Sequence, residues 1–179
     1  YKNQYTEDFD KCYLQNKYEA VSYITDSNQI YKTILSASQG EENDYKYFEI
    51  DEIKEIFIQR KSALKNFNKI TINDDFYLNF LSEFQTTEFT PDIIIFGYEE
   101  AIKENKYVGE INPFISENFW MIGRTGQGDE WFIDKVKGGI SFYDHNQGDY
   151  ADISQFQKLN IDFTDFVKMA FLFRELENE

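Results

Sequence analysis

The stretch FWMIGRTGQGDEWFIDKVKGGISFYDHN, Phe119 to Asn146, consists of three short apolar runs separated by two segments that carry glycine. Short runs rich in aromatic and β-branched residues are typical of strands, and brief glycine-containing segments between them are typical of hairpin turns. The stretch therefore predicts an antiparallel meander. Its three strands are expected at about 119–122, 130–134 and 140–144.

Apolar spacing predicts helices on both sides of this meander. We expect one helix over 51–66, and a second that is capped by Asn73 and turns Phe76, Phe80 and Phe84 inward. The short strand DIIIF then leads into a helix over YEEAIKENKY that closes near Gly109. A last helix, capped by Asp162, carries an apolar stripe formed by Phe163, Phe166, Val167, Ala170 and Phe171. Helices before and after a contiguous meander indicate an α+β fold.

The chain has 179 residues, of which 41% are hydrophobic and 18% aromatic, and this is enough apolar surface for the core of one domain. Its formal net charge is −15, from 33 acidic against 18 basic residues. A field of this sign disfavours nucleic acids and anionic membranes and attracts basic proteins. We therefore expect a basic protein partner, no nucleic acid and no membrane. The alternative is that the acidic side chains only solvate the surface.

No linker or repeat divides the chain, and its softest boundary is the polar segment SASQGEENDY, Ser36 to Tyr45. We expect an N-terminal helical extension over 1–45 and a single α+β domain over 46–179. The lone Cys12 forms no internal disulfide, which is compatible with a reducing cytoplasm. No apolar run approaches the ~20 residues of a membrane-spanning helix. Because the sequence does not begin with Met, it does not exclude a processed leader.

The loop GRTGQGD in the first turn lacks the spacing of a dinucleotide-binding fingerprint and the Gly-Lys-Ser/Thr of a P-loop, and its acidic end would repel phosphate. We interpret it as a turn in which Gly126 and Gly128 supply positive φ and Asp129 bonds local backbone amides. The single histidine, His145, is expected on the surface. Residues 144–152 contain half of a calcium-loop pattern without its final Glu. We expect no catalytic residue, cofactor or metal.

Four segments carry a family resemblance: ITINDDFYLNFLSEF from Ile70, IIIFGYEEAIKEN from Ile93, FWMIGRTGQGDEWFID, and ISFYDHN with the closing FTDFVKMAFLF. In this order they resemble the SUKH superfamily, which joins fungal regulators of cell-wall synthesis with many bacterial immunity proteins. The usual Leu-Pro start of the first segment is replaced by Ile72 and Asn73, and the usual Asn-Gly after its helix is absent. The resemblance covers roughly 51–176.

The resemblance implies a SUKH-like domain and a non-catalytic bacterial protein of the cytoplasm that neutralises a cognate toxin. Together with the charge, it predicts a basic partner, plausibly a nuclease. Strand alternation places Trp131 and Phe132 on opposite faces of the sheet, so one aromatic can anchor a partner unless a second helical layer covers it. The residues expected to bind the partner are Asp129, Glu130, Trp131, Tyr143 and Asp144, with Glu99, Glu100 and Glu110 at the rim.

Two alternatives remain open at this stage. A regulatory adaptor of the same family would bind a peptide or an enzyme in place of a toxin. A hydrolase would use a pair of carboxylates about 5 to 9 Å apart in a pocket. The sequence does not set the oligomeric state.

Overall fold

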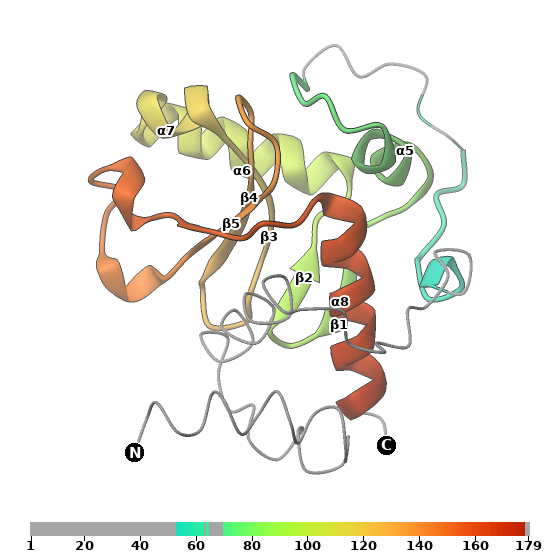
Figure 1. The fold of residues 1–179 in the computed structure, drawn as a ribbon. Helices are drawn as coiled ribbons and strands as arrows, with labels where there is room; N and C mark the ends of the chain where they lie inside the picture. The colour runs from blue at the N-terminus through green and yellow to red at the C-terminus, as the bar shows by residue number, and fades with distance from the viewer. Residues whose placement is uncertain (1–52, 63, 65–69, 178–179) are drawn as a thin grey trace, which may run out of the picture.

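The computed structural model describes residues 53–62, 64 and 70–177 (Figure 1). Six strands form one antiparallel sheet in chain order, with each strand beside the next. Helices pack on this sheet, and the predicted α+β class is confirmed. The strands are β1 (Thr87–Thr90), β2 (Ile93–Ile95), β3 (Phe119–Arg124), β4 (Glu130–Asp134), β5 (Ile140–Tyr143) and β6 (Gln157–Lys158). The helices are α5 (Asp75–Glu83), α6 (Tyr98–Ile111), α7 (Pro113–Asn118) and α8 (Phe163–Glu177), with 3-10 turns η1 (His145–Gln147) and η2 (Ile153–Gln155).

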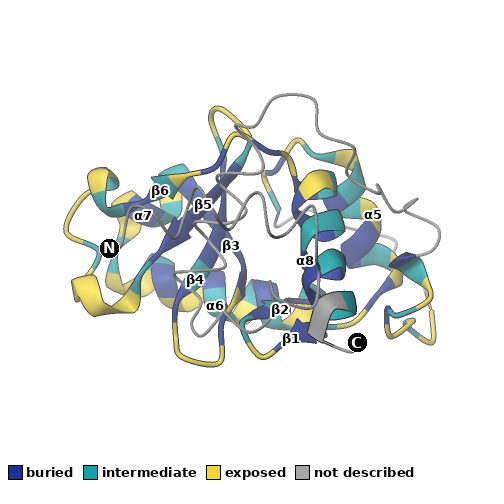
Figure 2. Cartoon of the chain, turned by 60° about the horizontal axis from the view of Figure 1, so that its bottom comes forward, coloured by how far each residue is buried: buried dark blue, intermediate teal, exposed yellow. Residues whose placement is uncertain are grey.

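The predicted meander is confirmed as β3, β4 and β5, and these strands are buried along most of their length (Figure 2). The register of β3 shifts between Met121 and Gly123. The buried side chain of Asn105 in α6 compensates, because its amide accepts from the Met121 N–H and donates to the Met121 carbonyl, both at 2.8 Å. Gly123 itself must be glycine, since a Cβ there would lie 2.2 Å from the Ile94 carbonyl oxygen.

Side-chain alternation gives the sheet two different faces. On the α8 face, Trp131 pairs across strands with Phe142 and contacts Phe166 of α8 at a ring-centroid distance of 5.0 Å. The opposite face is contacted by α6, α7 and the segment that follows β5. There Phe132 packs edge-on against Phe156. Both faces are therefore covered.

Local signals explain where the two helices of the α8 face begin. Asp162 accepts the backbone N–H of Asp165 at 2.8 Å, and this confirms the predicted cap of α8. The whole predicted stripe of α8 is buried. In α5 the cap is Asp74, which accepts the Tyr77 N–H at 2.9 Å, so the prediction of Asn73 was wrong by one residue.

Two other expectations need correction, and three elements were not predicted. The helix predicted over 51–66 does not continue through the described residues, because Gln59 forms an isolated bridge with Phe84 and Phe57 packs among aromatic rings. The helix predicted over YEEAIKENKY is α6, which passes through Gly109 and ends two residues later, at Ile111. The strands β1 and β6 and the helix α7 were not predicted.

The expected extension over 1–45 lies outside the described residues. Among the helices that the structure describes, none has the length and apolar character needed to span a bilayer.

Candidate functional site

A hollow of about 480 Å³ lies where β4 begins and β5 ends. Residues from α6, the two strands and the segment after β5 form its walls, so it exists only once these parts of the chain have come together. Its lining consists of Tyr107, Ile111, Asn112, Gly128, Glu130, Tyr143, His145, Gly148, Asp149 and Tyr150.

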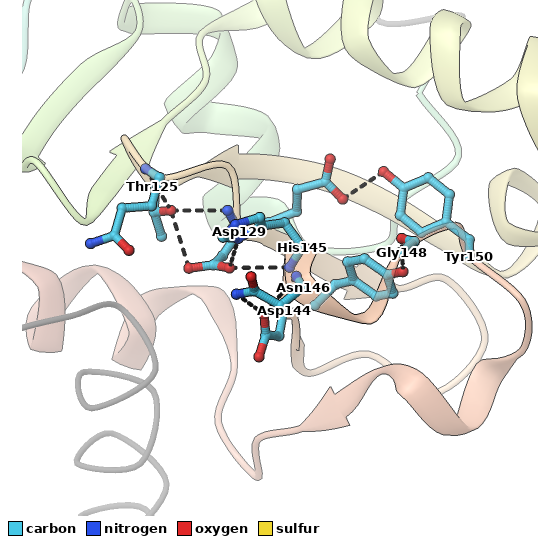
Figure 3. A network of polar contacts seen from close by, with 10 residues as sticks. Thr125, Asp129, Asp144, His145, Asn146, Gly148 and Tyr150 are labelled. Carbon is cyan, nitrogen blue, oxygen red and sulfur yellow. Dashed lines mark hydrogen bonds and ion pairs between the residues drawn. The ribbon is translucent and has the colours of Figure 1, made fainter.

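Beside the hollow, Asp129 connects the β3–β4 turn to the end of β5 (Figure 3). Its carboxylate accepts the backbone N–H of His145 at 3.1 Å and lies 2.6 Å from His145 Nδ1. The Thr125 hydroxyl also donates to it at 3.3 Å. Within the turn, Thr125 Oγ1 accepts the amides of Gln127 and Asp129, whereas the backbone amide that Asp129 accepts is that of His145 at the end of β5. Of the two turn glycines, Gly128 has positive φ, as predicted, and Gly126 does not.

Glu130 is the carboxylate inside the hollow. It begins β4, is partly buried, and accepts a hydrogen bond from the Tyr150 hydroxyl at 2.5 Å. Tyr143 faces it on β5, and the Tyr143 hydroxyl donates to the Gly148 carbonyl at 2.5 Å. The two tyrosine rings pack together at a centroid distance of 4.8 Å. The hollow therefore combines the partly buried carboxylate of Glu130 and the exposed carboxylate of Asp149 with aromatic walls.

Burial sets the protonation of these groups. Loss of solvent raises the pKa of Glu130 to about 7, although the hydrogen bond from Tyr150 acts in the opposite direction. The negative charges of Glu104 and Asp129 raise it further. Burial and the nearby Glu130 charge likewise raise the pKa of Tyr150, so this phenol stays protonated and remains a donor. Glu130 can therefore change charge near neutral pH.

The structure corrects the role predicted for Trp131. This side chain is fully buried on the α8 face and cannot be an exposed anchor for a partner. The alternative of a helical layer over that face is the one observed. Tyr143 and Asp129 are also almost completely buried. Tyr143 forms part of the wall of the hollow, and Asp129 contacts His145, another residue of that wall. Asp144 is half-buried and caps η1 by accepting the Asn146 N–H at 2.8 Å.

The three predicted rim residues do not lie together. Glu99 and Glu100 are in the first turn of α6, where Glu99 pairs with Arg60 and Glu100 lies 3.4 Å from the Arg124 guanidinium. Glu110 is near the other end of α6, adjacent in sequence to Ile111 in the hollow wall. Of these three, Glu110 is thus the one beside the hollow.

Sequence reasoning missed the exposed apolar side chains at the site. Tyr107, Ile111 and Phe114 have exposed fractions of 59%, 53% and 52%, and we call them the apolar ridge. Tyr107 and Ile111 are one helical turn apart on α6 and line the hollow, and Phe114 follows in α7. The signal available in the sequence was the presence of Tyr107 and Ile111 on the exposed, otherwise polar side of α6.

Two further interpretations depend on the carboxylates here. One ligand atom each from Asp129, Asp144 and His145 lies within 4.8 Å of the others, but the 2.6 Å contact of His145 with Asp129 has the length of a hydrogen bond. The hydrolase hypothesis requires two carboxyl groups in a pocket. Glu130 and Asp149 both line the hollow, and that hypothesis stays a prediction. His145 is exposed, as expected.

Comparison with protein-family models, with curated proteins and with solved structures finds no match to this chain. The SUKH resemblance therefore stays a prediction.

Proposed function

We propose that this chain is a non-catalytic binding protein whose acidic, partly apolar surface around the hollow recognises a basic protein. In the form that the sequence resemblance implies, the partner is a toxin that the chain neutralises. The observation that carries the proposal is the apolar ridge beside a hollow that contains carboxylates.

The apolar ridge supports the proposal because exposed large apolar side chains are concentrated there. Five large hydrophobic side chains are exposed in the described part of the chain, and three of them belong to the ridge. Scattered exposed apolar residues are ordinary, whereas a cluster beside a concave site is typical of a contact surface. Tyrosine is also among the residue types that dominate binding energy. The aromatic anchor first sought at Trp131 is thus replaced by Tyr107.

Charge supports a basic partner. The chain carries a formal net charge of −15, and Glu110, Glu130 and Asp149 lie in or beside the hollow. Such a field speeds the encounter with a cationic protein by roughly ten- to a thousandfold and weakens with salt. Apolar contacts then govern dissociation. The proposal therefore assigns capture to the acidic residues and retention to the ridge.

The test is binding of the purified chain to the toxin encoded beside its gene. We expect Ile111→Asp to weaken this complex at least about tenfold, because it places a charge in the apolar contact. Ile58→Asp is the matched control, since Ile58 is exposed to 56% and does not line the hollow. Absence of a complex with any neighbouring gene product would contradict the proposal. Equal losses in the two variants would contradict the assigned surface.

Gene neighbourhood separates this proposal from the adaptor alternative. Toxin domains and further immunity genes beside this one favour neutralisation, and a neighbourhood without them favours the adaptor. The hydrolase alternative is separated by turnover, since it requires activity that disappears when either Glu130 or Asp149 is replaced.

A further inference from the structure

The carboxylate of Glu130 has an unusual electrostatic setting. Within the described part of the chain it forms no ion pair, and its hydrogen bond comes from the neutral phenol of Tyr150. The Arg124 guanidinium, which acts on it through space, lies 3.4 Å from Glu100. A partly buried carboxylate therefore faces the hollow without a neighbouring cation of its own.

A second hollow of the same molecule provides an internal comparison. It has a volume of about 570 Å³ and contains the carboxylate of Asp134. Lys158 lies 3.1 Å from that carboxylate, and the amides of Val136 and Lys137 each donate to it at 2.9 Å. Burial alone would raise the pKa of Asp134, but these donors together lower it. Within the described residues, the fold thus gives Asp134 an ion-pair partner and gives Glu130 none.

We propose that the first hollow is a subsite for one basic side chain, an arginine or a lysine, of the protein partner. Its cation pairs with the Glu130 carboxylate, and its aliphatic stem lies against Tyr107 and Ile111. This inference rests on the proposed function, because that function identifies the protein to which the basic side chain belongs. The chemistry of the subsite, recognition of a guanidinium or an ammonium group, follows from the hollow itself.

Three features of the hollow fit a cationic group. One carboxylate oxygen of Glu130 accepts from Tyr150, and among the described residues no hydrogen bond occupies the other. Aromatic side chains attract cations at their ring faces, and Tyr107 and Tyr150 both contribute to the wall. Long basic side chains also carry an apolar stem that packs on apolar surface. At about 480 Å³ the hollow has the volume of a small ligand site.

Protonation of Glu130 makes the subsite sensitive to pH. Burial raises the pKa of Glu130 to about 7, so its carboxyl is largely uncharged at pH 5.5 and charged at pH 8. A cation should therefore bind at pH 8 and be released at pH 5.5. The other charged or titratable groups that face Glu130 are Tyr107, Tyr143 and Tyr150, Glu104, Asp129 and Asp149, Arg124 and His145.

The experiment uses the full chain labelled with ¹⁵N and titrated with N-acetyl-arginine N-methylamide or the corresponding lysine derivative. We expect amide shifts confined to the hollow at pH 8, and binding at least tenfold weaker in Glu130→Gln. Glu83→Gln is the control, because this exposed carboxylate at the end of α5 does not line the hollow. Shifts spread evenly over the acidic surface, or equal binding by the two variants, would overturn the inference.

The pH profile of the unmodified chain gives a second measurement that needs no substitution. Binding should fall at least about tenfold between pH 8 and pH 5.5, and any pH dependence left in Glu130→Gln does not come from Glu130. A profile that is the same with and without Glu130 would overturn the inference.

The outcomes also separate this inference from the proposed function. If the toxin binds through the ridge and Glu130→Gln leaves its affinity unchanged, the subsite is wrong and the function stands. If the arginine derivative binds at Glu130 and no neighbouring gene product binds, the subsite stands and the function fails.

Discussion

Glu130 and Trp131 are neighbours in β4 and face opposite sides of the same sheet. Trp131 is enclosed by Phe142 and Phe166, whereas Glu130 opens into a hollow with a tyrosine hydroxyl as its partner. The α8 face is filled by side chains, and the other face keeps a space with an uncompensated charge. One strand therefore contributes to stability on one side and to the candidate site on the other.

The largest expected effect tests the α8 face. Trp131→Ala should lower the free energy of unfolding by about 3–5 kcal/mol, because it removes a large aromatic side chain and leaves a cavity beside Phe166. Urea unfolding followed by circular dichroism measures this change. The control Trp131→Phe keeps an aromatic ring in most of this space and should cost clearly less. A loss below about 1 kcal/mol for the alanine variant would show that this face is not a continuous core.

The next largest effect is a gain in stability, and it concerns Glu130 in the hollow. Glu130 has a pKa raised from 4.5 to about 7 in the folded chain, so the unfolded chain ionises first as pH rises. The contribution of Glu130 to stability is therefore greatest below about pH 4.5 and falls between pH 4.5 and 7. At pH 8, Glu130→Gln should raise the free energy of unfolding by up to about 3 kcal/mol and flatten this profile.

Urea unfolding at pH 4, 6 and 8 measures that profile for both chains. At pH 4 they should differ little, and this comparison is the internal control. If the glutamine variant is less stable at pH 8, the Glu130 carboxylate stabilises the fold. Both faces of β4 would then contribute to stability, which contradicts the comparison. Stabilisation combined with loss of cation binding would show that the charge is kept at the expense of stability.

The smallest effect sharpens the description of the α8 face. Asp162→Ala should lower the free energy of unfolding by about 1 kcal/mol, because it removes the acceptor for the Asp165 amide at the start of α8. Asp162→Asn keeps an acceptor and should restore most of the loss. Equal losses in the two variants would indicate that the charge of Asp162 matters and its hydrogen bond does not. Thermal unfolding of the three chains at one pH gives the answer.

Features with a local sequence signal were predictable. The meander follows from glycine-bearing turns between short apolar runs, and the start of α8 follows from a capping carboxylate before an apolar stripe. The helix predicted over 51–66 shows the limit of such signals. Its periodic apolar residues Ile53 and Phe57 are buried, but tertiary pairing of Gln59 with Phe84 overrides the helical spacing.

The candidate site was less predictable because distant segments assemble it. Glu130 and Tyr143, two of the predicted binding residues, line the hollow because they lie opposite each other on adjacent strands, and Asp129 lies beside them. Tyr107 and Tyr150 come from α6 and from the segment after β5, and no spacing in the sequence relates them to β4. Side-chain alternation also predicts which residues of a strand share a face, but it does not predict which element covers that face. For this reason Trp131 was expected on the surface.

The position of α8 after all six strands has a consequence for synthesis of the protein. Chains emerge from the ribosome N-terminus first, and every strand can pair with its predecessor as it appears. The contact of Trp131 with Phe166 forms only when α8 has followed. The nascent sheet therefore lacks this aromatic contact for the time needed to translate its last helix, and folding of the α8 face is complete only after synthesis of residues 163–177.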